Sequence, residues 1–497
     1  MKSSCWHLGL LLIVGGQIAL LAQQSPSSAR WPSSRPPRPL SARDVSFPSY
    51  DIRSLPNGLQ VVVVQHHEQP AVSARLLVRA GAAQDPKGKA GVAALMGALL
   101  DQGTKTRSAE AIADAIDYMG GTLGAGAGTD LTFANALVIK DDLSTGLDLL
   151  SDITRRPAFA QQEIDRQREQ LLSGMKVNYQ DPDYVADLVF DRLVFGFHPY
   201  GFPSSGTPES VSRITRDDLV AFHNTYFAPN NSLLAIVGDV TLEEAFKGAE
   251  RAFGDWERKE VPPPNTTPPP APTRRLIVID RPGAVQTEMR VGHLAIARKH
   301  ADYFALNLAI RILGGEGANR LHGILRSDRG LTYGAEADLK SLKQTGDIVA
   351  ETDTRSDATA EALRLTVEEF WRLQRDPVGE RELEGAKAYM SGNFPLTIET
   401  PDAIAMQVLN ALFYETDLKE LQTFRERVQG VTVDEIQRVA QNYVIPNRLS
   451  IVLVGDASTF ASSLKGAGFG DFEVIPLDEL DLSAPDFRRR PARPAQP

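Results

Sequence analysis

Two segments of the chain carry the same pattern, and this internal repeat constrains the fold more than any other feature. NTYFAPNNSLLAIVGDV (224–240) and QNYVIPNRLSIVLVGDA (441–457) both place Pro-Asn before an aliphatic run that ends in Val-Gly-Asp. An amphipathic helix precedes each segment, and Thr215 and Thr432 are its predicted N-caps, each followed by acidic residues. The period is much longer than that of a solenoid, so the repeat predicts a duplicated domain of roughly 210 residues.

Hydrophobic periodicity within each copy predicts the fold class. The predicted strands are 59–67, 73–81, 131–139, 275–280 and 287–296, and the predicted helices are 90–101, 108–119, 143–155, 160–177, 301–314 and 356–375. Each half therefore runs from strands through helices to a final strand. We expect an α+β fold with two homologous domains, each a mixed or antiparallel sheet packed with helices.

Proline-rich stretches divide the chain. VPPPNTTPPPAPT (261–273) has little to bury and predicts a linker between the two halves. The predicted organisation is a signal peptide (1–22), a Pro/Ser-rich spacer (23–47), a first domain (48–260), the linker, a second domain (274–482) and a disordered tail (483–497).

The N-terminus predicts export. One positive charge, Lys2, precedes an apolar run from Leu8 to Ala22, which is short for a membrane span but typical of a secretory signal. Residues 1–43 contain several Arg and no acidic residue, so an organelle transit peptide is the alternative, although the run is apolar all round rather than amphipathic. We expect no stable membrane span in the mature chain.

Cysteine usage agrees with export to a bacterial periplasm. The only cysteine, Cys5, lies within the predicted signal, so the mature chain would contain none. Disulfides, thiolate nucleophiles and Cys-ligated zinc are then excluded. The formal net charge of −10 argues against a nucleic-acid partner.

Several motifs in order along the chain carry a family resemblance. They are VRAGAAQDPKGKAGVAALMGALLDQGTKTRSAEAI (78–112), HPYGFPSSGTPESVSRITRDDLVAFHNTYFAPNN (198–231), AVQTEMRVGHLAI (284–296) and GGEGANRLHGILRSDRGLTYGAEADL (314–339). Together they resemble the M16 (pitrilysin/insulinase-like) metallopeptidases almost from end to end. A duplicated domain with a linker between the halves is also what that family shows.

The resemblance locates a zinc site that this chain has lost. The family carries H-x-x-E-H on the helix at 90–101, where two His spaced i and i+4 reach one metal ion and the Glu activates its water. Here those positions are Ala94, Gly97 and Ala98, and the third ligand, a Glu on a later helix, corresponds to Gly174. We predict no metal and no catalytic residue in this chain.

No other histidine restores the site. None of the eight His has a partner at helical i, i+4 spacing, and neither H-x-x-E-H nor H-E-x-x-H occurs in the chain. Gly124 stands in a Gly/Ala-rich strand where active members carry Asn. The Gly/Ala run favours a close backbone approach, for instance of another chain, or is simply a flexible strand beside an unused cleft.

The second half keeps a different pair of residues. In the family, an Arg and a Tyr from the segment RLHGILRSDRGLTY (320–333) contact the bound peptide near the scissile bond; here they are Arg326 and Tyr333. They are expected at a helix end and a strand start, with Gly330 making the turn. A guanidinium can donate to peptide carbonyls, and a phenol can donate to a developing oxyanion. Without the motif, Arg326 would be interpreted as an ordinary surface cation and Tyr333 as a packing aromatic.

The resemblance implies a non-catalytic, substrate-contacting subunit. In two-chain M16 systems one chain carries the zinc and the other carries the Arg/Tyr pair, so we expect a zinc-bearing M16 homologue as the partner in a heterodimer and an extended peptide as the substrate. Any zinc would lie in the partner. The alternatives are a scaffold without proteolysis, a lone peptide-binding or chaperone-like module, and an active peptidase with unidentified ligands.

Overall fold

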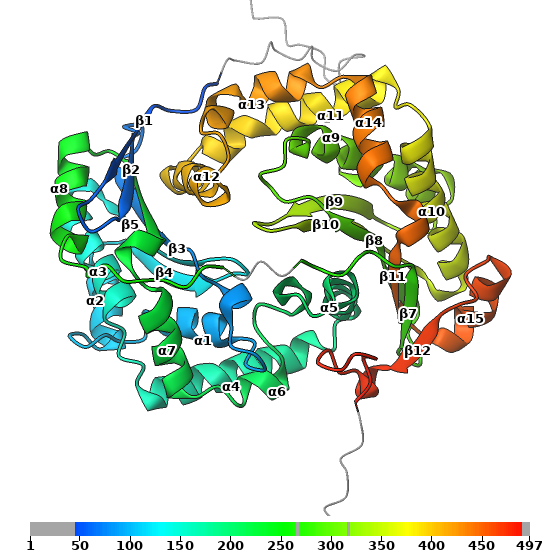
Figure 1. Cartoon of the computed structure of the whole chain (residues 1–497), viewed down its shortest axis with the longest axis horizontal. Helices are drawn as coiled ribbons and strands as arrows, with labels where there is room; N and C mark the ends of the chain where they lie inside the picture. Colours follow the sequence, from blue (N-terminus) through cyan, green and yellow to red (C-terminus); the bar gives the residue numbers. More distant parts are fainter. Residues whose placement is uncertain (1–44, 265–267, 316–318, 490–497) are drawn as a thin grey trace, which may run out of the picture. The chain divides into compact units, whose positions relative to one another are not determined.

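The computed structural model describes residues 45–264, 268–315 and 319–489, all within one compact unit. Two six-stranded sheets have the orders β1-β2-β6-β3-β5-β4 and β12-β7-β11-β8-β10-β9 (Figure 1). Parallel and antiparallel pairs occur in both sheets. The predicted α+β class with two similar halves is therefore confirmed.

Five of the described strands in each half follow the same order, whereas the sixth is the first strand of its half in one sheet (β1) and the last in the other (β12). The strands are β1 Tyr50–Ser54, β2 Gln60–Gln65, β3 Ala71–Val78, β4 Thr122–Ala127, β5 Thr132–Ile139, β6 Ser232–Gly238, β7 Arg275–Asp280, β8 Gln286–Ala295, β9 Ala335–Ser341, β10 Gly346–Arg355, β11 Ser450–Gly455 and β12 Glu473–Pro476. The α-helices are α1 Val92–Leu99, α2 Ala109–Tyr118, α3 Leu143–Arg155, α4 Gln161–Asn178, α5 Pro182–Phe195, α6 Pro208–Val211, α7 Arg216–Tyr226, α8 Leu242–Phe253, α9 Tyr303–Gly314, α10 Thr359–Arg375, α11 Glu380–Asn393, α12 Pro401–Tyr414, α13 Lys419–Gly430, α14 Val433–Tyr443 and α15 Ala457–Gly466.

The repeated segments form equivalent parts of the two sheets. Strands β6 and β11 are fully buried, and each pairs in parallel with the first long strand of its own half, β2 or β7. Helices α7 and α14 precede them and begin at capping boxes, in which Thr215 pairs with Asp218 and Thr432 with Glu435. Both predicted N-caps are confirmed.

Two helices are exchanged between the halves. Helix α5 of the first half packs on β8 and β11 of the second sheet, and α12 of the second half packs on β3 and β6 of the first. Phe190 of α5 shares a core with Ile277 and Val452, while Ile404 of α12 shares one with Val62. Each sheet thus has one face covered by a helix from the other half, so neither half completes its core alone.

The exchanged helices begin in the same way and make matching ion pairs. Both start with Pro-Asp, after the N-caps Asp181 and Thr400. Asp402 of α12 pairs with Arg75 of β3, at 3.1 Å between Oδ1 and Nη1, and Asp183 of α5 pairs with Arg290 of β8. The two arginines occupy equivalent sheet positions, each opposite the residue three before the glycine that ends β6 or β11.

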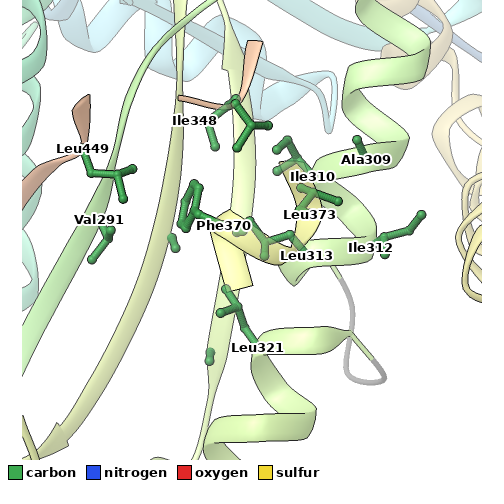
Figure 2. Close-up of a cluster of buried hydrophobic side chains, with 14 of the residues drawn as sticks. Val291, Ala309, Ile310, Ile312, Leu313, Leu321, Ile348, Phe370, Leu373 and Leu449 are labelled. Atoms are coloured by element: carbon green, nitrogen blue, oxygen red, sulfur yellow. The ribbon is translucent and has the colours of Figure 1, made fainter. Parts of the chain in front are cut away.

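The largest core of the second half surrounds α9. Figure 2 shows part of it, with Ala309, Ile310 and Leu313 of α9 near Ile348 of β10 and Phe370 of α10. These side chains are at most 1% exposed. The core fixes α9 between the sheet and its neighbouring helices, and leaves only one narrow stripe of α9 partly accessible.

Charged residues are enclosed where α5 meets the second sheet. Arg290 is 1% exposed and pairs with Asp187 at 2.7 Å as well as with Asp183. Loss of hydration raises the pKa of Asp191 to about 7, and burial together with the charge of Asp191 raises the pKa of Asp347. Oδ2 of Asp347 is buried without a hydrogen-bond partner among the described residues.

The structure corrects two predicted boundaries. The predicted disordered tail begins too early, because Phe487 is 1% exposed and its ring lies 5.3 Å from the Arg192 guanidinium. The predicted spacer ends too late, because Phe47 is 4% exposed and packs in the core beneath α12. The predicted signal peptide, residues 23–44 and residues 490–497 lie outside the described part of the chain.

The predicted strands and helices agree with the structure within three residues at each end. The described linker residues, 261–264 and 268–273, contain no helix or strand. Among the described helices, none combines the length and the apolar character that crossing a membrane requires.

The exchange of α12 predicts an asymmetry between two positions on that helix. Ile404→Ala should lower the free energy of unfolding by about 2–5 kcal/mol, because Ile404 is 0% exposed against the first sheet. Met406→Ala on the same helix, at a side chain that is 42% exposed, should change it by about 0.5 kcal/mol or less. Urea denaturation measures both, and equal effects would contradict the packing of α12.

The raised pKa of Asp191 predicts the sign of a pH effect. The folded chain keeps this proton while the unfolded chain loses it above its ordinary pKa near 4, so the contribution to stability is present at low pH and is lost as the pH rises toward 7. Asp191→Asn is neutral throughout, so the variant should gain stability relative to the wild type between pH 5 and pH 8. Urea denaturation at both values tests this, and parallel pH profiles would refute it.

Candidate functional site

Helix α1, where the family resemblance places the zinc site, has a firmly fixed start. Gly91 precedes it with φ +99°, and a Cβ there would lie 2.6 Å from the Ser205 carbonyl oxygen. The Asp85 carboxylate accepts hydrogen bonds from the N–H of Gly91 at 2.6 Å and of Ala93 at 2.8 Å. Loss of hydration raises the pKa of Asp85 to about 7, although these hydrogen bonds oppose the shift.

Helices α1 and α4 line a cleft of about 300 Å³ that brings three of the predicted positions together. Ala94 and Ala98 of α1 face it together with Gly174 of α4. These side chains are methyl groups or hydrogen and offer no electron pair to a metal ion. The polar groups that also line the cleft are the amides of Gln167, Gln170 and Asn178, the hydroxyl of Ser205 and the phenol of Tyr184.

The fourth position, Gly97, is closed by backbone. A Cβ on Gly97 would lie 2.8 Å from the carbonyl carbon of Gly126 and 2.9 Å from the nitrogen of Ala127, both in β4. A glutamate could not replace Gly97 without displacing that strand. The glycine-rich strand therefore approaches a helix of its own chain closely, where the sequence had also suggested a second chain.

The residues at these four positions do not fit a zinc ion or a general base. Across the described ranges, no group of three or more His, Cys, Asp or Glu side chains is arranged to hold a metal. Helix α1, which lines the cleft, packs through Gly97 against β4, the last strand in the order of the first sheet. An edge strand of this kind offers free backbone groups with which an extended peptide can pair.

Arg326 and Tyr333 lie on either side of a tight reversal. Arg326 is in a short π-helix, His322–Asp328, and Gly330 then adopts φ +61° while the Leu331 N–H donates to the Leu325 carbonyl at 2.8 Å. Gly330 thus makes the predicted turn. Tyr333 lies two residues before β9 rather than at its first residue.

Both side chains are accessible. Tyr333 is 84% exposed, and Arg326 is exposed with Nη1 3.2 Å from Nε2 of His322. Among the described residues no carboxylate forms an ion pair with Arg326, in contrast to Arg320, which Glu382 binds through both oxygens. The pair is free to contact a ligand, and its role stays a prediction.

Substitution by alanine at two glycines of the lost zinc site should change the free energy of unfolding in opposite directions. Gly97→Ala should reduce the free energy of unfolding by about 1–3 kcal/mol, because its Cβ meets backbone that cannot move alone. Gly174→Ala should raise it by about 0.4–1 kcal/mol, because nothing lies within 4 Å and alanine restricts the unfolded chain. Thermal and urea denaturation decide the matter, and a stable Gly97→Ala protein would show that α1 and β4 are farther apart.

Relatives of the chain include proteins named as zinc proteases. It is 27% identical over 406 residues to an uncharacterized zinc protease of Mycobacterium tuberculosis, covering 81% of this chain and 92% of that protein. It is 23% identical over 352 residues to an uncharacterized zinc protease of Bacillus subtilis, covering 70% and 84%.

Solved structures share the fold. A crystal structure described as a peptidase M16 inactive domain from Pseudomonas fluorescens is 27% identical, with a TM-score of 0.78, and covers 82% of this chain and 98% of that one. A protease from Helicobacter pylori, 21% identical with a TM-score of 0.77, covers 82% and 99% and shows the likeness of fold alone.

Two models of one family match successive parts of the chain. The model described as insulinase (peptidase family M16) matches residues 60–196, which include α1 and α4, and the model described as the peptidase M16 inactive domain matches residues 213–390, which include Arg326 and Tyr333. The two matches follow each other along the chain as the two similar halves do, and the first match contains the helices that line the emptied cleft. The chain therefore belongs to peptidase family M16.

Proposed function

We propose that this protein is the non-catalytic, substrate-contacting subunit of a two-chain M16-type zinc metallopeptidase that degrades or processes peptides. One observation carries the proposal: Ala94, Ala98 and Gly174, none of which has a side-chain atom that could bind zinc, meet in one cleft, and β4 closes the position of the general base. Helices α1 and α4 still enclose a cleft, but the positions where the family has its zinc ligands hold Ala or Gly. A zinc-bearing M16 homologue would then supply hydrolysis as the partner.

Arg326 and Tyr333 would act on the peptide in the partner's site. The Arg326 guanidinium is exposed and forms no ion pair with a carboxylate of the described residues, so its N–H groups are available to donate to peptide carbonyls. The exposed Tyr333 phenol can donate a hydrogen bond to the oxygen of the attacked carbonyl as negative charge develops there. Both roles require groups that meet the substrate rather than the protein core.

The edge of the first sheet would bind the peptide main chain. Strand β4 pairs with β5 on one side and is the terminal strand of the sheet. Main-chain pairing along it would be indifferent to sequence, which suits degradation of varied peptides. The net charge of −10 mildly favours neutral or basic peptides.

The proposed compartment is outside the cytoplasm, in a bacterial periplasm. The support is the apolar run 8–22 and a single cysteine, Cys5, within it. Fractionation of host cells with the tagged protein tests this part separately.

Isolation from the native host tests the partner, and substitution tests the residues. Affinity purification of the tagged chain should recover, in a one-to-one ratio, a homologue with H-x-x-E-H. In that complex, Arg326→Ala combined with Tyr333→Phe should lower kcat/KM for peptide hydrolysis by at least about a hundredfold, because donors to the reacting carbonyl are lost.

The matched control is Arg329→Ala. Arg329 is also exposed in the same segment, and its ion pair with Glu361, at 3.7 Å, is a surface pair. Because surface ion pairs contribute little, loss of Arg329 should leave hydrolysis and assembly unchanged. Recovery of the chain without a zinc-bearing partner would favour a scaffold or a lone peptide-binding protein. Undiminished hydrolysis by the double variant would remove the substrate-contact role.

A further inference from the structure

The second half contains a cavity of about 340 Å³ between α9, α11, α12 and α13. It occupies the same place in the repeat as the emptied cleft of the first half. In both cases the first helix after the β3 or β8 strand faces a later helix, α4 or α11, across the space. Amide and aromatic side chains line both spaces, but only this cavity is also lined by charged side chains, namely those of Arg298, Arg311 and Glu420.

The equivalence extends to individual positions. Over residues 91–100 only Ala94 and Ala98 are half-buried, and over residues 304–314 only Asn307 and Arg311 are. Both pairs have i, i+4 spacing and point into their cavity. The second half therefore presents two functional groups where the first half presents two methyl groups.

Both groups have polar atoms without partners. Arg311 donates from Nη1 to the Gly315 carbonyl at 3.1 Å, whereas its Nε is buried with no partner among the described residues. Asn307 points Nδ2 at the Tyr303 hydroxyl at 3.5 Å, while its Oδ1 is likewise buried and unpaired. A buried donor and a buried acceptor left unpaired cost free energy, which a ligand with both complementary groups would restore.

The charge of the cavity favours an anion. Arg298 is neutralised by Glu420, to which it donates a hydrogen bond, and no described carboxylate forms an ion pair with Arg311. The Nε–Nη2 edge of a guanidinium binds a carboxylate through two parallel hydrogen bonds. With Nη1 committed to Gly315, this is the edge of Arg311 that remains.

The remaining walls suit an apolar side chain. The Arg311 guanidinium lies 5.1 Å from the centroid of the Tyr389 ring, and Phe394 stacks on Phe424 with centroids 4.9 Å apart. Aromatic walls of this kind bury an aliphatic or aromatic group.

We propose that this cavity binds an α-carboxylate with a neighbouring N–H and an apolar side chain, as found at the carboxyl end of a peptide or in a free amino acid. The carboxylate would pair with Arg311, and the N–H would donate to Oδ1 of Asn307 one helical turn away. This site lies apart from Arg326 and Tyr333 in the sequence and does not rest on the function proposed above.

Calorimetry on the full chain tests the proposal with three probes: N-acetylphenylalanine, its carboxamide and free phenylalanine. N-acetylphenylalanine should bind, and the carboxamide should bind at least about tenfold more weakly because it lacks the charge that pairs with Arg311. Binding of free phenylalanine as tightly as the acetylated acid assigns the site to amino acids, and a preference for the acetylated acid assigns it to peptide ends. Equal binding of acid and carboxamide, or no binding of the acid at millimolar concentration, overturns the proposal.

Substitutions separate a binding role from a structural one. Asn307→Asp is nearly isosteric and places a carboxylate beside Arg311, so it should abolish binding of the acid while the thermal transition is retained. Arg311→Lys keeps the charge but loses the two-donor edge and should weaken binding at least about tenfold. Arg364→Lys, at a partly exposed arginine of α10 paired with Glu368, is the matched control and should leave binding unchanged. Unaltered binding in Asn307→Asp would overturn the proposal.

Discussion

The exchange of α5 and α12 is the constraint on which the rest of the structure depends. Each helix begins with Pro-Asp, crosses to the other half and places its aspartate against an arginine at an equivalent position of the opposite sheet. The apolar faces of these helices then complete two cores that would otherwise be open. Tyr184 of α5 also lines the cleft of the first half, and α12 lines the cavity of the second.

The two halves use this common framework differently. In the first, α1 presents two methyl groups to the cleft and carries a glycine that β4 covers, so this helix supplies no functional group there. In the second, the equivalent helix carries an amide and a guanidinium. Duplication supplied two copies of one cavity, and the side chains at two positions per helix decide whether either can bind a ligand.

The sequence could predict the repeat and the capped helices because each is a local pattern, and the resemblance to the M16 family indicated the positions of the emptied zinc site. Thr215 and Thr432 indicate where their helices begin, and once the resemblance identifies positions 94, 98 and 174, residue identity shows that they hold no metal ligand. The tertiary exchange could not be predicted in this way, because the amphipathic pattern of α12 gives no indication of which sheet it covers.

Other features depend on distances that no local pattern carries. The closeness of Gly97 to Gly126 and the burial of Phe487 both arise from contacts between segments remote in sequence. For the same reason Asn307 and Arg311 read as ordinary polar residues of an amphipathic helix until α11 and α12 are placed around them.

The late position of α12 in the chain has a consequence for biosynthesis. The first sheet has all its strands once β6 is made, yet the face that α12 covers stays open until residues 401–414 have left the ribosome. During that interval α5 also lacks β11, one of the strands on which it packs. From the end of β6 to the end of α12, a nascent chain therefore carries two incompletely covered apolar surfaces, and a chain that stops at the linker would keep them and be prone to aggregate.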